Sequence, residues 1–215
     1  MVDLVTSETV LWYIPNQIGY LRVITAVISL FSMREHPVFT SFVYGVSCLL
    51  DAVDGTMARR YNQVSRLGAV LDMVTDRCST ASLTCFLAVM YPQWCVAFQL
   101  LISLDLASHY MHMYASAACG SASHKRVARE SSKLLHWYYT RRDVLFTVCA
   151  FNEIFYMGLY LYSFERFSTL GSLLVTVCLP GYLFKQVANV VQLHRAALIL
   201  AGVDAREAND RAQRM

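Results

Sequence analysis

Apolar residues in this sequence are gathered into long runs, which short polar segments separate. Six of the runs reach about 20 residues, the length that an α-helix needs to cross a bilayer. They cover residues 11–33, 37–58, 67–90, 94–114, 143–164 and 170–193. The pattern predicts an all-α integral membrane protein with six transmembrane helices and a short N-terminal interfacial segment at 1–10. Since the runs occupy most of the 215 residues, we expect a single membrane domain over 1–215.

The composition agrees with a membrane protein. Of the residues, 56% are apolar and 15% are charged, whereas about a quarter of the residues of a soluble domain are charged. The seven cysteines stand singly in apolar stretches without CxxC spacing, which argues against a zinc site and a disulfide framework. We expect them to be buried, reduced packing residues. The sequence contains no nucleic-acid-binding module, so we expect no nucleic acid partner.

The placement of Lys and Arg predicts the orientation in the membrane. Six spans put both termini, the segment after the second run and the segment after the fourth run on one side, which carries most of the basic residues. The other side carries Arg34 and Arg166, and Arg22, Arg77 and Lys185 fall within spans. The positive-inside rule places the basic side in the cytosol. We therefore expect both termini, and any chemistry beside the basic segments, to be cytosolic.

Four aspartates stand at helical spacing around the end of the second run and the start of the third. Asp51 and Asp54 are three residues apart, and Asp72 and Asp76 are four apart, so each pair lies on one face of its helix. Antiparallel helices that a short loop joins pack side by side. We therefore expect the four carboxylates to converge just inside the cytosolic boundary of the membrane.

Such a cluster predicts a metal site. Four carboxylates close together in a medium of low dielectric constant need a compensating positive charge. Oxygen ligands without nearby His or Cys favour hard cations, so we expect Mg²⁺ or Mn²⁺, with two ions balancing the four charges. Two divalent ions can hold the attacking and leaving oxygens of a phosphoryl transfer. A single aspartate could instead pair with Arg22 or Arg77, but four in register do not fit that explanation.

Small residues and an arginine accompany the aspartates. Gly55, Ala58 and Gly68 lie on the same helix faces as the acids, where they leave room for a ligand or for a close helix contact. Arg59 carries a planar guanidinium, which suits the binding of phosphate.

The stretch from Asp51 to Asp76 has the form D-x2-D-G-x2-A-R-x8-G-x3-D-x3-D. It resembles the signature of the CDP-alcohol phosphatidyltransferases, with every fixed position present at the right spacing. The segments 14–22, 103–109, 123–125, 138–140 and 152–156 further resemble the eukaryotic phosphatidylinositol synthases. The resemblance implies a six-helix fold, a homodimer, a location in the endoplasmic reticulum, and a metal site that opens to the cytosol and its leaflet.

The resemblance also implies roles for single residues. Asp51, Asp54 and Asp72 would hold the metals, whereas Asp76 would contribute to the metal site and act as general base on the acceptor hydroxyl. Contacts with the CDP part of the donor would come from Asn16, Gly55, Arg59, Ser65 and Gly68. For Asn16, a turn or helix-cap role after Pro15 is an equal alternative.

The activity that the resemblance implies is transfer of the phosphatidyl group of CDP-diacylglycerol to myo-inositol, which yields phosphatidylinositol and CMP. Enzymes that use other alcohols share the signature, so glycerol 3-phosphate and serine stay open as acceptors. A cation or proton transporter is a further alternative, because intramembrane acids also mark ion pathways. Such acids commonly lie near the midplane of the bilayer, whereas these cluster toward one end.

Inositol is neutral, so hydrogen-bond donors and acceptors in a wet site would recognise it. The candidate contacts lie near the cytosolic side, in the fourth run, the polar segment that follows it and the start of the fifth run. They are His109, His112, His124, Lys125 and Arg142. The first two could instead be helix-packing residues, and Lys125 and Arg142 could be charges that set the topology.

Overall fold

The computed structural model describes residues 5–127 and 141–214, without the side chains of 119–127 and 142. Every regular element in these residues is a helix, which confirms the all-α fold. Internal contacts divide the chain into two compact units, Met1–Phe86 and Leu87–Met215. Each unit is described by itself below.

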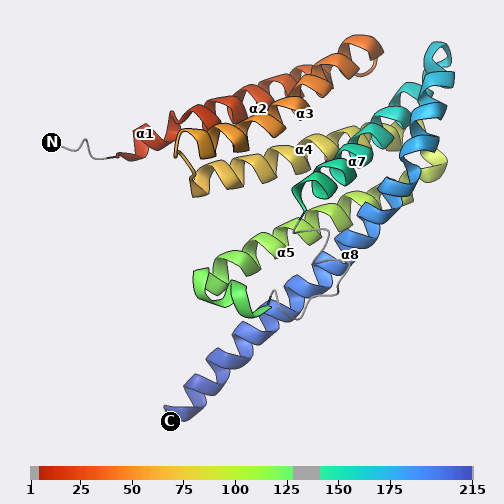
Figure 1. Cartoon of the computed structure of the whole chain (residues 1–215). Coiled ribbons are helices and arrows are strands. Elements are labelled where there is room, and N and C mark those ends of the chain that lie inside the picture. Colours follow the sequence, from red (N-terminus) through yellow and green to blue (C-terminus); the bar gives the residue numbers. More distant parts are fainter. Residues whose placement is uncertain (1–4, 128–140, 215) are drawn as a thin grey trace. The chain divides into compact units, whose positions relative to one another are not determined.

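The first unit contains α1 (Ser7–Leu11), α2 (Ile14–Ser32), α3 (Pro37–Arg60) and most of α4 (Arg66–Met90) (Figure 1). Local chemistry explains where these helices begin. The Thr6 hydroxyl caps α1 by accepting a hydrogen bond from the backbone N–H of Thr9 at 3.2 Å. Both α2 and α3 carry a proline in their first turn, where the missing N–H costs nothing.

Hydroxyl side chains line the contact between α2 and α3. The hydroxyls of Ser32 and Thr40 share a hydrogen bond of 2.8 Å, and Ser47 donates to the backbone carbonyl of Arg22 at 3.1 Å. By contrast, Phe31 and Phe42 point outward and are largely exposed. Polar groups inside and apolar groups outside are the arrangement expected of helices that lie in lipid.

The loop between α3 and α4 is short and tightly held. Asn62 has a positive φ of 54°, a conformation that asparagine tolerates better than most residues. The amide oxygen of Gln63 accepts the backbone N–H of Ile14 at 2.9 Å, and the Ser65 hydroxyl accepts that of Gly68 at 2.9 Å. The loop is therefore bonded both to the start of α2 and to the start of α4, which carries two of the aspartates.

The second unit contains η1 (Pro92–Trp94), α5 (Cys95–Val127), α7 (Arg142–Tyr162), η3 (Glu165–Phe167) and α8 (Ser168–Gln213). Glycines allow α7 and α8 to approach closely. A Cβ on Gly171 would meet the backbone nitrogen of Tyr162 and would lie 2.7 Å from the carbonyl oxygen of Gly158. The contact between α5 and α8 includes polar groups, since the Gln192 amide donates to the Ser108 carbonyl at 3.2 Å.

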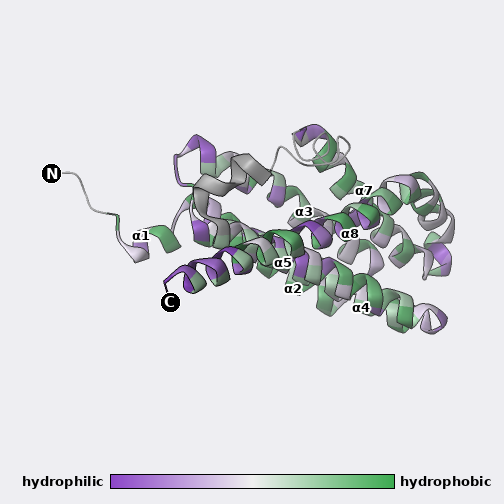
Figure 2. Cartoon of the chain, turned by 90° about the horizontal axis from the view of Figure 1, so that it is seen from below, coloured by the Kyte–Doolittle hydropathy of each residue, from purple (hydrophilic) through white to green (hydrophobic). Residues whose placement is uncertain are grey.

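Four helices in the described residues are long and apolar enough to cross a membrane: α2, α3, α7, and α8 with the η3 turn before it. The helices α4 and α5 are as long but are not among these four; α4 carries Asp72, Asp76 and Arg77, and α5 carries Asp105. Figure 2 shows hydrophobic residues along the helices and a hydrophilic C-terminal end on α8. The membrane-protein class is thus confirmed, and six spans stay a prediction.

Two further predictions concern the N-terminal segment and the cysteines. Within the expected interfacial segment at 1–10, the structure describes the residues from Val5 onward, and they include most of the five-residue helix α1. Cys178 is buried, as expected, but Cys78 and Cys85 are exposed on their helix. The expectation of buried cysteines was therefore wrong for these two, because an apolar helix surface accepts the small, apolar cysteine side chain as a core does.

Candidate metal centre

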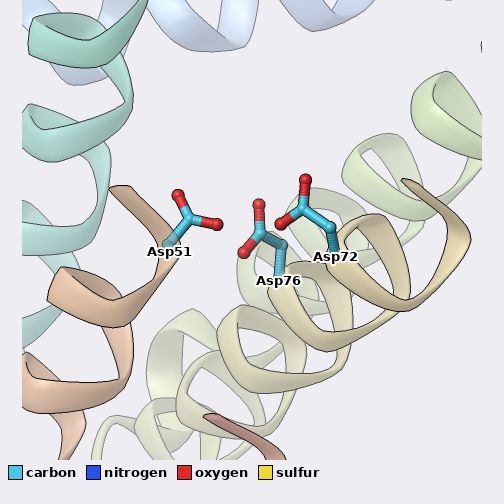
Figure 3. Close-up of side chains that lie close together, drawn as sticks. All are labelled: Asp51, Asp72 and Asp76. Carbon is cyan, nitrogen blue, oxygen red and sulfur yellow. The ribbon is translucent and has the colours of Figure 1, made fainter. Parts of the chain in front are cut away.

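The four aspartates converge within the first unit, as their spacing predicts. Asp51 and Asp54 lie on neighbouring turns of α3, and Asp72 and Asp76 lie on neighbouring turns of α4. Figure 3 shows the carboxylates of Asp51, Asp72 and Asp76 turned toward one another from the two helices. One ligand oxygen from each of these three lies within 4.8 Å of the others, a spacing that a bound cation can bridge.

A guanidinium from α2 lies at the centre of the cluster. Nη1 of Arg22 donates to Asp54 at 2.8 Å and to Asp72 at 2.7 Å. Nη2 contacts Asp51 at 2.7 Å and Asp76 at 2.5 Å. Each nitrogen thus joins one aspartate of α3 to one of α4, and the Arg22 side chain is only 2% exposed.

This contact corrects an expectation from the sequence. Four aspartates in register were expected not to pair with an arginine, yet all four contact Arg22. The signal was present, because Arg22 is the one basic residue in the first apolar run. A planar guanidinium has two terminal nitrogens and can therefore serve two pairs of carboxylates at once.

The residues nevertheless fit a divalent metal. Four ionised carboxylates against the one guanidinium of Arg22 leave an excess of three negative charges, and Arg77, whose Nη2 lies 3.4 Å from Asp76, offsets one of them. The side chains of Asp51, Asp72 and Asp76 are 38%, 45% and 33% exposed, so an ion can reach them. Asp54 is 12% exposed. An all-oxygen donor set is the one that Mg²⁺ and Mn²⁺ prefer.

Three of the residues expected to contact CDP lie together beside the loop. Asn16 is fully buried, and its amide nitrogen donates to the carbonyl oxygen of Val10 at 2.6 Å. Within the described residues its Oδ1 has no hydrogen-bond partner. A Cβ on Gly68 would lie 2.9 Å from this oxygen and 3.1 Å from the Ser65 hydroxyl, so the glycine makes room for both polar groups.

The structure also gives local roles to two of these residues. Asn16 lies inside α2 and bonds back to the end of α1, so it does not cap α2, and the turn alternative describes it better. Ser65 precedes α4 and accepts the N–H of Gly68, which is the geometry of an N-cap.

The remaining CDP candidates lie at the end of α3. Arg59 is exposed in the last turn of the helix. A Cβ on Gly55 would approach its guanidinium to 3.5 Å, an ordinary contact. The Arg59 head group therefore lies beside Gly55, one turn beyond the aspartates, and a small side chain at position 55 would not displace it.

The acceptor candidates belong to the second unit. His109 is partly buried on α5, where its Nδ1 lies 2.8 Å from the carbonyl oxygen of Asp105 and 3.5 Å from its carboxylate. His112, one turn further along α5, is exposed. The side chains of His124, Lys125 and Arg142 lie outside the described residues. The backbone of Arg142 begins α7.

A buried polar network adjoins His109, and it was not expected from the sequence. The Lys185 ammonium donates to the Asn189 amide oxygen at 2.9 Å, and the amide nitrogen of Asn189 donates to Asp105 at 3.3 Å. Both α8 residues are buried. Lys185, Asn189 and Gln192 recur at helical spacing in an apolar run, which is the pattern that could have revealed a polar face on α8.

Comparison with known proteins shows the family of the chain. The profile of the CDP-alcohol phosphatidyltransferase family matches residues 12–201, a range that includes residues of both units. The chain is similar to the CDP-diacylglycerol–inositol 3-phosphatidyltransferase of Saccharomyces cerevisiae, with 66% identity over 207 residues that cover 96% of this chain and 94% of the yeast protein.

Proteins of the same name from two other organisms are also similar. The Candida albicans protein is 54% identical over 207 residues, covering 96% of this chain and 90% of the relative. The Homo sapiens protein is 43% identical over 206 residues, covering 94% of this chain and 97% of the relative. No solved structure matches the chain.

Proposed function

Because the chain belongs to the CDP-alcohol phosphatidyltransferase family, we propose that it transfers the phosphatidyl group of CDP-diacylglycerol to myo-inositol and releases CMP. The family supports the donor and the reaction class. The names of the yeast and human relatives support inositol as the acceptor. The observation that carries the proposal is the convergence of four aspartates from α3 and α4 on the guanidinium of Arg22.

Asp51, Asp54, Asp72 and Asp76 would hold two divalent ions, Mg²⁺ or Mn²⁺. When bound, such ions neutralise charge on a diphosphate and on the leaving CMP. The two helices supply the ligands from neighbouring turns of rigid backbone, so the carboxylates are positioned before substrate arrives. The partial exposure of Asp51, Asp72 and Asp76 suits residues that face both an ion and a substrate.

Asp76 is our proposed general base. In the reaction, an inositol hydroxyl oxygen forms a bond to the phosphorus that carries the lipid, and the bond from that phosphorus to CMP breaks. The hydroxyl proton passes to the Asp76 carboxylate. Asp76 suits this role because Oδ1 is the oxygen that contacts Arg22, whereas Oδ2 lies at a longer distance, 3.4 Å, from Arg77.

The donor nucleotide would lie at the cytosolic end of α3 and α4. The exposed Arg59 guanidinium offers a planar donor for phosphate, and it lies beside Gly55. Asn16, Ser65 and Gly68 would contribute the other contacts. Oδ1 of Asn16, which no described residue hydrogen-bonds, would accept from a donor group of the ligand.

We further propose that inositol is selected by His109, His124, Lys125 and Arg142, with His112 as a further candidate. The buried network around Asp105 would hold His109 in place, since Asp105 contacts both the imidazole and Asn189. A polyol has no charge, so several such hydrogen bonds are needed to recognise it.

The cellular setting completes the proposal. The chain would be a single domain over 1–215 with six spans, cytosolic termini and a cytosolic active site in the endoplasmic reticulum membrane. It would act as a homodimer in the lipid bilayer, with no nucleic acid partner. Because the chain belongs to the CDP-alcohol phosphatidyltransferase family, we set the transporter alternative aside. Glycerol 3-phosphate and serine remain the rival acceptors, because other alcohols are used with the same metal motif.

The deciding experiment gives the purified full-length protein CDP-diacylglycerol, Mn²⁺ and one alcohol at a time, and measures CMP release. We expect release with myo-inositol, at least about 100-fold slower release with serine or glycerol 3-phosphate, and none in excess EDTA. The matched controls are Asp72→Asn, which should be inactive, and Asp204→Asn, an exposed position on α8, which should be fully active. Turnover in EDTA would overturn the metal mechanism, and preferred use of glycerol 3-phosphate would overturn the acceptor.

A further inference from the structure

The position of Arg22 has a consequence for metal binding. Its two terminal nitrogens lie 2.5 to 2.8 Å from one oxygen of each aspartate. Mg²⁺ binds carboxylate oxygens at about 2.0–2.1 Å. An ion among the same oxygens would therefore stand within a few ångströms of a permanent positive charge that touches its ligands.

We propose that Arg22 is an internal counter-cation that holds the four aspartates together without metal, and that divalent ions must displace it to bind. This inference rests on the metal role proposed for the aspartates. It adds a competition between a side chain of α2 and the ion, which lowers the apparent affinity of the site for metal.

The first argument is electrostatic. Four carboxylates on two adjacent helices would repel one another in the metal-free protein. Arg22 is a basic residue that contacts all of them, and each of its terminal nitrogens links α3 to α4. The guanidinium thus keeps the site assembled when no ion is present. Its positive charge is also what an incoming ion must overcome.

The second argument concerns how firmly the guanidinium is held. Its Nε is buried and has no hydrogen-bond partner in the described part of the chain, so the head group is held through its two terminal nitrogens. The contacts that retain it are therefore the same carboxylates that would bind the metal. Each aspartate that binds an ion contacts Arg22 less strongly. Displacement of Arg22 and binding of the metal are therefore coupled, and each favours the other.

The test measures Mn²⁺ binding to the purified full-length protein by the electron paramagnetic resonance signal of free Mn²⁺, without substrate. Arg22→Gln should bind Mn²⁺ about 10- to 100-fold more tightly than the wild type. Arg60→Gln removes the same charge from an exposed position at the end of α3, and its dissociation constant should change by less than about twofold, because exposed charges are screened.

Thermal unfolding supplies a second readout. In EDTA, Arg22→Gln should melt roughly 10 °C below the wild type, because four acids lose their shared partner. Added Mn²⁺ should recover most of that loss, so the gain on metal addition should be larger than in the wild type. Arg60→Gln should melt as the wild type does in both conditions.

Arg22→Lys covers the case in which the glutamine variant does not fold. A lysine keeps the charge but has a single head-group nitrogen. The Mn²⁺ affinity of Arg22→Lys should therefore lie between those of the wild type and Arg22→Gln. Unchanged or weaker Mn²⁺ binding in the Arg22 variants that fold would overturn the competition. Absence of Mn²⁺ binding in both the wild type and the Arg22 variants would instead overturn the metal role itself, so the two failures are distinguishable.

Discussion

At the scale of single residues, the contacts of Asp76 differ from those of the other aspartates. Oδ1 accepts a hydrogen bond from Arg22 at 2.5 Å, and Oδ2 lies 3.4 Å from Arg77. Oδ2 is therefore the less closely held oxygen, and it is the one that we propose accepts the proton. An asparagine in place of Asp76 would keep one ligating oxygen but could not take up the proton, so the effects on binding and on turnover can be separated.

We therefore predict that Asp76→Asn lowers kcat by about 10²- to 10⁴-fold, while the KM for CDP-diacylglycerol changes by only a few-fold. Steady-state kinetics with Mn²⁺ in excess measure both quantities, and Asp204→Asn serves as the matched control. A kcat close to that of the wild type would mean that another group accepts the proton.

At the scale of elements, the close contact between α7 and α8 depends on Gly171, which has no side chain. Gly171→Ala would push a methyl group into the backbone of Tyr162 and Gly158. Since the atoms it would meet belong to the backbone, the helices must separate, at a cost of about 1–3 kcal/mol. We predict a lower melting temperature for this variant in detergent, by thermal unfolding of the purified protein.

Gly202→Ala is the control for that prediction. It makes the same change in the same helix, but a Cβ there meets nothing within 4 Å among the residues that the structure describes. Alanine is favoured over glycine in helices by up to about 1 kcal/mol, so this variant should melt at or above the wild-type temperature. Equal melting of both variants would show that the close approach at Gly171 contributes no stability.

The helices also show how far the sequence predicts the structure. Apolar runs and proline positions predict α2 and α3 to within a few residues, because helix length and backbone chemistry are local properties. The facing of Asp51 and Asp72 follows from spacing and a short loop. The role of Arg22 does not, because Asp54 and Asp76 are 32 and 54 residues away from it. Only the packing of α2 against α3 and α4 brings the three together.

At the scale of the whole molecule, the number of spans depends on α4 and α5. They are long enough but are not among the four helices that are also clearly apolar enough, and both carry acids. Intramembrane acids are tolerated when they face a partner or a wet site. Asp72 and Asp76 contact Arg22, and Asp105 contacts Asn189. These acids are therefore compatible with helices that cross the bilayer, and six spans remain our prediction.

Cysteine labelling tests that topology on the full chain in a cysteine-free background. We predict that Val64→Cys, in the loop before α4, and Gln93→Cys, in the turn after it, react with an impermeant maleimide from opposite sides of sealed vesicles. Both positions are exposed. Asn209→Cys, near the end of α8, should react from the same side as Val64→Cys, because six crossings return the chain to the side of its N-terminus. Labelling of Val64→Cys and Gln93→Cys from one side would mean that α4 does not cross. The positive-inside assignment would then fail as well, since it rests on the loop before α4 and the C-terminal end of α8 lying together in the cytosol.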